Sequence, residues 1–299
     1  MEGSVLTVVV LPVALGVIML GLGLGLTLAD FQRVAKMPRA VAVGLVCQMV
    51  VLPGVAYLIA KAFRLPPELA VGLMLLSASP GGATANLFSH LAKGDVALNI
   101  TLTAVNSVLS LFTLPLILSL AMLAFLGSAR AIPLQFAKIL QVFVIVLGPV
   151  GIGMALRARK PGFADAANKP VKILSAVFLL LVIAATVLKE RAHILDYAQQ
   201  VGLAALAFNL TSLGVGYFVP RLFKLGRRQA IAIGMEIGIH NGTLAIAIAS
   251  SPLILNNGTM AIPPAIYSLL MFFTAAGFGW LVNRLPAGDE TLAAGIAGP

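Results

Sequence analysis

Long apolar runs separated by short polar segments make up most of the chain. Nine runs are long enough, or nearly so, to cross a bilayer as a helix, which takes about 20 apolar residues: 5–28, 40–60, 69–91, 96–126, 138–156, 173–188, 197–219, 229–252 and 263–283. They lack the alternation of apolar and polar positions, over about ten residues, that barrel strands require. The pattern therefore predicts an all-α integral membrane protein with about nine transmembrane helices.

The composition agrees with a membrane protein. Of the 299 residues, 60% are hydrophobic and 10% are charged, and the mean hydropathy is +1.04. A soluble domain has about 25% charged residues. The excess of Lys and Arg, 20 against 10 Asp and Glu, lies in short clusters between apolar runs. No aromatic residues are interleaved with these clusters, which favours loop charge over nucleic-acid binding. The single cysteine, Cys47, excludes a disulfide within the chain.

The basic residues orient the predicted spans. With nine spans the two termini lie on opposite sides, and the loops of one side carry fourteen Lys and Arg against six on the other. Positive loops stay in the cytoplasm, so the N-terminus is predicted outside and the C-terminus inside. We expect a multi-pass protein of the inner (plasma) membrane of a bacterium, with residues 285–299 as a tail.

A similar sequence segment occurs at two of the predicted spans. The segment "FRLPPELAVGL" at 63–73 returns as "FKLGRRQAIAI" at 223–233, an offset of 160 residues. The first precedes the third predicted span and the second precedes the eighth, and this odd separation reverses their direction across the membrane. This internal similarity predicts an inverted-topology repeat, a common architecture of secondary transporters. The first repeat would cover 1–137 with four spans, and the second 138–284 with five.

Both echoed spans contain helix-breaking residues near the middle of the membrane. They are Pro80, Gly81 and Gly82 in "SASPGGATAN", and Asn241 and Gly242 in "IHNGT". Proline removes a backbone donor, and glycine weakens a helix by about 1 kcal/mol relative to alanine. The carbonyls freed at such breaks suit a cation, and the half-helix N-termini suit an anion. The pattern predicts a binding site where the breaks meet; a kink absorbed by packing is the alternative.

One carboxylate lies beside the second break. Between Arg228 and Arg284, Glu236 is the only Asp, Glu, Lys or Arg. Ionisable residues in a membrane are costly and usually functional, and a bound cation would supply the countercharge. The alternative is a protonated glutamic acid that serves packing alone.

Three motifs in order carry a family resemblance: "LGVIMLGLGLGLTLADF", "SPGGATANLFSHLAKGDVAL" and "EIGIHNGTLAIAIA". Through them the chain resembles the bile acid:sodium symporter family over roughly 10–283. The resemblance implies that the two broken helices cross at mid-membrane. It also implies a panel domain of about 5–28 and 138–188, and a core domain of about 40–126 and 197–283.

The resemblance further implies Na⁺ as the coupling ion, in one or two copies, and no organic cofactor. The first sodium site would be formed by Glu236, Asn86, Asn99, Thr103 and the carbonyl of Ala85, which stands where the family often has serine. A second site would be formed by Gln48, Glu236, Ile237, Ile239 and His240. Na⁺ is a hard cation that prefers oxygen ligands. His240 has no side-chain oxygen and replaces a family glutamine, which weakens the expectation of a second site.

The function implied by the resemblance is sodium-coupled symport. An organic anion, bile-acid-like or a smaller carboxylate, would be imported by alternating access. Half-helix amides and one side chain would hold its carboxylate, at Ala83, Thr84, Asn241, Gly242 and Thr243. The expected partners are this small anion and the lipid bilayer; nucleic acid is not expected, and the sequence indicates no protein partner.

Other functions compete with symport. Glu236 and His240, spaced i, i+4, could serve a proton-coupled carrier or a sodium/proton exchanger, whereas a channel or membrane receptor would need no stoichiometric coupling. An enzyme is not expected. A zinc protease needs two histidines around the acid, as in H-E-x-x-H, and no serine has a His–acid pair that the sequence places beside it.

Overall fold

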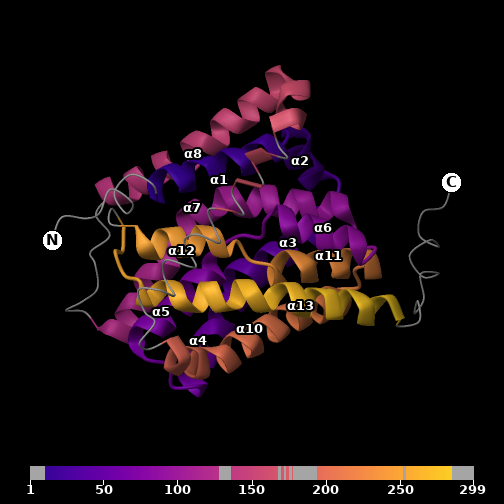
Figure 1. Ribbon diagram of the computed structural model, residues 1–299. Helices are drawn as coiled ribbons and strands as arrows, with labels where there is room; N and C mark the ends of the chain where they lie inside the picture. The colour runs from indigo at the N-terminus through magenta and orange to yellow at the C-terminus, as the bar shows by residue number, and fades with distance from the viewer. Residues whose placement is uncertain are drawn as a thin grey trace.

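The computed structural model describes residues 11–127, 136–167, 170–171, 173–174, 177, 194–251 and 254–284. Within these residues the chain is helical and contains no strand, apart from one isolated backbone bridge between Gly81 and His240. The prediction of an all-α protein is confirmed for this part of the chain. The long helices run roughly side by side, and α1 and α8 lie together at one edge of the assembly (Figure 1).

The helices follow the predicted apolar runs. In chain order they are α1 (Leu11–Gly25), α2 (Leu28–Gln32), η2 (Arg33–Ala35), α3 (Pro38–Val46), η3 (Cys47–Val51), α4 (Leu52–Ala62), α5 (Pro67–Ala78), α6 (Ala83–Leu91), α7 (Val96–Leu126), α8 (Phe136–Arg159), α10 (Ile194–Leu222), α11 (Arg227–Gly238), α12 (Gly242–Ser250), η4 (Thr259–Ala261) and α13 (Ile262–Arg284).

Four described segments are long and apolar enough to cross a membrane: 38–62, 96–126, 199–222 and 259–284. The predicted run 173–188 falls almost entirely outside the described residues, as do the tail 285–299 and the start of the first run. The count of nine spans therefore stays a prediction.

Two of the predicted runs are interrupted helices. α5 ends at Ala78 and α6 begins at Ala83, with Gly82 as its N-cap residue. α11 ends at Gly238 and α12 begins at Gly242. In Figure 1 the chain passes from α5 on the left to α6 on the right, and from α11 on the right to α12 on the left. The two interrupted helices therefore run in opposite directions.

The approach to each interrupted helix has the same backbone geometry at the offset of 160 residues. Arg64 and Lys224 have φ angles of 51° and 58° and are left-handed residues that close the preceding helices. The next amides, those of Leu65 and Leu225, each donate to a carbonyl five residues back at 3.0 Å. This local identity supports an internal repeat; its inverted topology in a membrane stays a prediction, as do the repeat boundaries.

α1 and α8 form a tightly packed pair. A Cβ atom on Gly23 would lie 2.2 Å from the carbonyl oxygen of Val150, and one on Gly153 would lie 2.5 Å from that of Leu20. Small residues allow such close backbone approach between membrane helices. The pair also contacts α7 and α12. The panel and core domains, with their boundaries, stay predictions.

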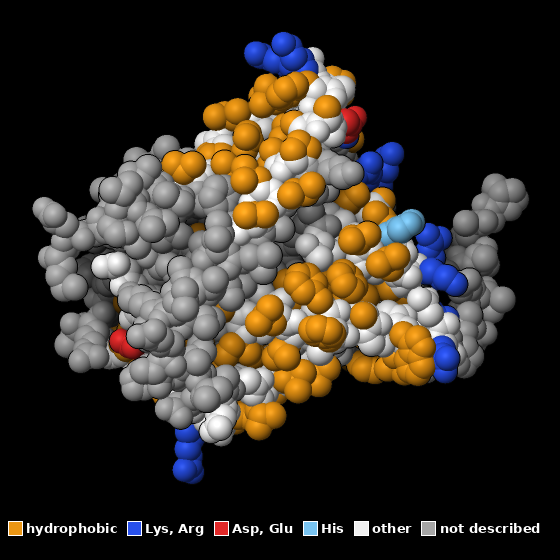
Figure 2. Space-filling model, viewed as in Figure 1, with side chains coloured by type: hydrophobic (Ala, Val, Ile, Leu, Met, Phe, Trp, Pro, Cys, Tyr) orange, Lys and Arg blue, Asp and Glu red, His pale blue; other side chains and the backbone are white. Residues whose placement is uncertain are grey.

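The outer surface suits a lipid environment. Figure 2 shows hydrophobic side chains over much of the visible described surface, with Lys and Arg near its extremities. Helix ends supply several of these basic residues, including Arg157 and Arg159 of α8, Arg221 of α10 and Arg284 of α13. Apolar flanks with basic ends are the expected surface of a membrane-spanning helical protein.

Candidate functional site

The two helix interruptions contact each other directly, and we call this contact the crossing. The Asn241 amide donates to the Pro80 carbonyl at 2.8 Å, and Gly81 forms the isolated antiparallel bridge with His240. A Cβ atom at residue 81 would lie only 2.5 Å from carboxylate atoms of Glu236. Glycine at this position therefore lets the backbone of the first interruption approach the acid beside the second.

Glu236 is fully buried and accepts only neutral donors. The Thr103 hydroxyl donates to Oε2 at 2.6 Å, the Asn106 amide nitrogen donates to Oε1 at 3.1 Å, and the Gly81 backbone amide also donates to the carboxylate. Within the described part of the chain, Glu236 has no ion-pair partner. A buried carboxylate is costly without a countercharge, so this geometry favours a bound cation.

Three buried amide oxygens on α6 and α7, the helices that pack against α11, have no hydrogen-bond partner among the described residues. They are Oδ1 of Asn86 on α6 and Oδ1 of Asn99 and Asn106 on α7. The Asn99 amide nitrogen donates to the Ala232 carbonyl on α11 at 2.7 Å, which orients its side chain. Buried polar atoms are normally paired. Neutral oxygens beside a carboxylate are suitable Na⁺ ligands, so α6, α7 and α11 together can hold a hard monovalent cation.

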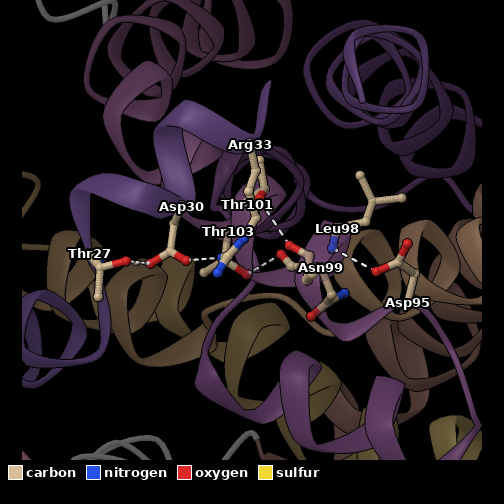
Figure 3. A network of polar contacts seen from close by, with 9 residues as sticks. Thr27, Asp30, Arg33, Asp95, Leu98, Asn99, Thr101 and Thr103 are labelled. Carbon is tan, nitrogen blue, oxygen red and sulfur yellow. Dashed lines mark hydrogen bonds and ion pairs between the residues drawn. The ribbon is translucent and has the colours of Figure 1, made fainter. Parts of the chain in front are cut away.

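The start of α7 is fixed one turn before Asn99. Asp95 is the N-cap residue, and its side chain accepts from the Leu98 amide at 3.0 Å. Figure 3 shows Asp95, Asn99 and Thr103 along this part of α7. Because Thr103 follows Asn99 by four residues, both lie on one face of the helix. Capping therefore helps to hold the register of the residues that face Glu236.

A second buried acid, Asp30, has a different environment. It accepts from the backbone amide and hydroxyl of Thr27 at 2.7 and 2.8 Å, and it pairs with Arg33 (Figure 3). Its charge is therefore matched inside the protein. Glu236 differs because its described partners are all neutral, which singles it out as the site for an external cation.

The sequence prediction missed Asn106. It follows Thr103 by three residues and belongs to a polar stripe along the buried side of an otherwise apolar helix: Asn99, Thr103, Asn106, Ser110 and Thr113. The spacing of four, three, four and three residues keeps these side chains on one face. This spacing was the available sequence signal. The remaining predicted residue of the first site, Ala85, is buried in the first turn of α6.

Gln48 and His240 meet at the end of α5. The Gln48 amide nitrogen lies 3.1 and 3.0 Å from the carbonyl oxygens of Ser77 and Ser79, and His240 Nδ1 lies 3.0 Å from the same Ser79 oxygen. The His240 ring stacks on Phe208, with 5.7 Å between centroids. These contacts join the two interruptions without an ion. The second sodium site, with the buried Ile237 and Ile239 beside it, stays a prediction.

The groups predicted to bind the anion differ in whether they already form hydrogen bonds within the protein. The Gly242 amide donates to the His240 carbonyl at 2.9 Å, and Asn241 Oδ1 accepts from the Leu244 amide at 3.0 Å. The Asn241 side chain therefore caps α12. Ala83 and Thr84 begin α6, where Gly82 provides no side-chain cap. The first-turn amides of α6, together with that of Thr243, are the predicted groups best able to meet an anion.

A cavity lies between the α1–α8 pair and the crossing. The space that it encloses is about 20 Å³, which is roughly room for one water molecule. Apolar side chains of α1, α2 and α8 form most of its wall, and Pro80, Ser107, Ser110 and Leu244 form the side toward the crossing. The cavity combines an apolar wall with a few polar groups, as small-molecule sites commonly do.

Fold and site together define a helical membrane protein with a candidate cation site at the crossing of two interrupted helices. Residues 12–197 match the Sodium Bile acid symporter family. The uncharacterized sodium-dependent transporter YocS of Bacillus subtilis is 30% identical over 262 residues, which cover 85% of this chain and 77% of that protein. The human hepatic sodium/bile acid cotransporter is 28% identical over 269 residues, covering 89% and 74%. The probable chloroplastic sodium/metabolite cotransporter BASS2 of Oryza sativa subsp. japonica is 25% identical over 281 residues, covering 93% and 65%.

The chain belongs to the sodium bile acid symporter family. This membership confirms the resemblance carried by the three motifs. It makes the protein a member of a family of sodium-coupled membrane transporters, not of enzymes, with Na⁺ as the coupling ion. The number of ions, the substrate and the residues that bind them stay predictions.

The first site predicts graded effects for its neutral ligands. We expect Asn86→Ala and Thr103→Val each to raise the sodium concentration for half-saturation by about tenfold, because each removes one neutral contact to a charged group. Thr101→Val is the matched control, since the Thr101 hydroxyl bonds to the Ala97 carbonyl at 2.9 Å. Equilibrium binding of radioactive sodium measures all three. Unchanged sodium affinity in both site variants would show that the ion binds elsewhere.

Proposed function

We propose that the protein is a sodium-coupled symporter that imports a small organic anion by alternating access. The observation that carries this proposal is the buried Glu236 carboxylate, which has neutral donors and partnerless amide oxygens around it. We assign one Na⁺ to this position. The ion would neutralise the acid and connect α6, α7 and α11.

Sodium would couple to the substrate through the helix crossing. Glu236 of the proposed sodium site lies next to Gly81, and Gly81 is bridged to His240 at the other interruption. Fixing this crossing also fixes the starts of α6 and α12, whose partial positive charges favour an anion. Substrate would therefore bind well only after sodium has ordered these helix ends.

The substrate would bind at the cavity beside the crossing, which would have to widen to admit it. Its wall on the α1–α8 side is apolar, while the opposite side contains two serine hydroxyls and the first turn of α12 at Leu244. This lining favours an organic anion with a compact apolar body and a carboxylate directed at the helix ends. A lining of this kind accepts several carboxylates, and the family name alone does not select a bile acid.

Alternating access would arise from motion between the α1–α8 layer and the helices around the crossing. The glycine contacts at Gly23 and Gly153 hold α1 and α8 together, whereas the cavity separates this pair from the crossing. We propose that these layers correspond to the panel and core of an inverted repeat. Movement between two such units around a fixed site is the usual scheme for such carriers. The charge bias of the loops favours an external N-terminus and a cytoplasmic C-terminus in the inner membrane of a bacterium.

The proposed function predicts reciprocal linkage between sodium and an anionic substrate. A screen of carboxylates by thermal shift, with and without sodium, would identify a ligand, because a molecule that binds the folded state raises its stability. We expect sodium to tighten the ligand at least tenfold, the ligand to tighten sodium equally, and the neutral amide analogue to bind at least tenfold more weakly.

Proteoliposomes supply the transport test. An inward sodium gradient should drive accumulation of the labelled ligand, while a proton gradient in sodium-free buffer should drive none. Accumulation driven by protons alone would contradict sodium coupling, and passive equilibration without accumulation would indicate a channel. An amide analogue that binds as tightly as its parent acid would contradict the anion site.

A further inference from the structure

Four basic residues lie near one end of the protein, where α6, α11 and α13 meet. Lys93 is in the turn that follows α6, and Arg284 is the last residue of α13. Arg227 and Arg228 are the first two residues of α11. Figure 2 shows basic side chains gathered at this end, on the right, beside a broad hydrophobic surface. None of the four has a carboxylate ion-pair partner within the described residues, so the described part of the chain does not neutralise this positive charge.

The three helix ends are in direct contact. The Asp95 amide, in the turn after α6, donates to the Arg228 carbonyl at 2.9 Å. The Arg227 guanidinium donates to the Val282 carbonyl in the last turn of α13. In Figure 1 these helix ends lie together at the right of the assembly, and each of the three helices packs against the other two. The fold therefore brings cations that are far apart in the sequence to one place.

α6 and α13 pack against each other along an apolar seam that leads away from these cations. The Phe88 and Phe272 rings stack with 6.2 Å between their centroids. Nearer the basic residues, a Cβ atom on Gly279 would lie 3.3 Å from that of Ala92. We call this contact between the two helices the α6–α13 seam. Its small residues lie one position before Lys93 and five positions before Arg284, so the seam ends at the basic residues.

Both helices of the seam also expose large apolar side chains. On α6 these are Leu87 and Leu91, and on α13 they are Phe273 and Trp280, each of them more than half exposed. Spacings of four and seven residues place each pair on one face of its helix. In a membrane such faces contact the acyl chains of lipids. The seam therefore offers an apolar surface that ends in a group of cations.

Trp280 positions one of these cations. The guanidinium carbon of Arg284 lies 4.1 Å from the centre of the Trp280 ring. A guanidinium that stacks on an aromatic face can still donate hydrogen bonds from the N–H groups at its edge. Tryptophan is enriched where membrane proteins meet the lipid headgroups, and a long basic side chain there extends its charge toward the headgroups. Arg284 is therefore held at the level expected for a lipid phosphate.

We propose that the α6–α13 seam binds an anionic phospholipid, with Lys93 and Arg284 holding its phosphate and the exposed apolar side chains contacting its acyl chains. Lysine and arginine form charge-assisted hydrogen bonds with phosphate, and basic pockets between membrane helices bind anionic headgroups. A zwitterionic lipid has the same phosphate but also carries a cation, which the basic group would repel. The site includes neither the sodium ligands nor the cavity beside the crossing, so the inference goes beyond the proposed symport.

Trp280 provides the readout, because it is the only tryptophan of the chain. Bromine atoms near the headgroup end of lipid acyl chains quench the fluorescence of a tryptophan that the lipid contacts. The full-length protein is reconstituted in phosphatidylcholine vesicles that contain a rising fraction of brominated phosphatidylglycerol or, separately, of brominated phosphatidylcholine. For the wild type we expect half-maximal quenching at an about tenfold lower fraction of the anionic lipid, because basic residues near the membrane surface attract anionic headgroups.

Lys93→Gln should reduce this lipid preference about fivefold. Lys36→Gln is the matched control, because Lys36 is an exposed lysine just after η2, on the side of the membrane where Lys93 is predicted to lie, and it should keep the wild-type preference. Equal quenching by the two lipids in the wild type, or a preference that is the same in both variants, overturns the site. Both variants should keep the rise of melting temperature with sodium, and absence of that rise in the wild type would count against the proposed function alone.

Discussion

Glu236→Gln is expected to abolish sodium-driven uptake while the protein still folds and inserts. The carboxylate accepts from Thr103, Asn106 and Gly81 and has no described ion-pair partner. Glutamine keeps the volume but removes the charge that would hold Na⁺. Its amide nitrogen can replace Oε2, because the Thr103 hydroxyl can rotate to accept a hydrogen bond. Asn106 and Gly81 can then continue to donate to the remaining oxygen.

The loss of charge should reduce sodium affinity at this site by more than about a hundredfold. Electrostatic attraction in a buried environment greatly exceeds the value of one neutral ligand, so the effect should exceed that of Asn86→Ala. The measurements are sodium-dependent uptake in proteoliposomes and the rise of the melting temperature with added sodium. Wild-type sodium dependence in both assays would show that Glu236 does not bind the coupling ion.

Glu236→Asp provides a second variant with the charge retained. Its shorter side chain moves the carboxylate away from the Thr103 and Asn106 donors, so sodium binding should weaken but persist. If Glu236→Gln and Glu236→Asp lose sodium binding equally, geometry rather than charge limits the site. If only Glu236→Gln loses it, the negative charge is the required property.

Much of the site could be predicted because its chemistry is unusual for its surroundings. A lone acid and breaker residues stand out in apolar runs, so Glu236, Pro80 and Gly81 were recognisable from the sequence. The membrane setting makes each of them costly unless a partner is present. The long apolar runs likewise predicted the helices, since the backbone of a lipid-exposed segment must satisfy its own hydrogen bonds.

The remaining details depend on contacts between distant segments. Asn106 lies 130 residues before Glu236, and only folding brings their side chains within 3.1 Å. The sequence likewise contains Gln48 as a plausible ion ligand, but not the fact that its amide nitrogen contacts Ser77 and Ser79. The sequence identifies which side-chain oxygens are present. It does not identify which donors are already used, and that distinction decides which atoms remain for a cation.

At the helix crossing, the role of a glycine depends on which position of the interruption it occupies. Gly81 and Gly82 are adjacent and both lie in the first interruption. A Cβ atom at Gly81 would meet three carboxylate atoms of Glu236 at 2.5 to 2.6 Å, whereas one at Gly82 would meet nothing within 4 Å. Neither has a positive φ angle, so the difference between them comes from the contact with Glu236 rather than from backbone strain.

Gly81→Ala is therefore expected to disrupt the sodium site, whereas Gly82→Ala should leave the fold and sodium binding intact. The carboxylate cannot move away from a new methyl group without lengthening its bonds to Thr103 and Asn106. Overpacking of this kind costs about 1–3 kcal/mol in stability. Displacement of several ligands at once should weaken sodium by more than about a hundredfold.

The two glycine variants should be compared by melting temperature without sodium and by the sodium-dependent rise in that temperature. Gly81→Ala should lower the melting temperature without sodium and remove its rise with sodium, whereas Gly82→Ala should preserve both. Equal behaviour of the two variants would contradict the close approach of Gly81 to Glu236.

A double variant tests whether contact with Glu236 causes the loss, because the effects of mutations at two residues in contact do not add. Because Glu236→Asp shortens the acid that the new methyl group meets, it should cost less sodium affinity in the Gly81→Ala protein than in the wild type. If the two costs are equal, the damage caused by Gly81→Ala comes from elsewhere in the interruption rather than from contact with Glu236.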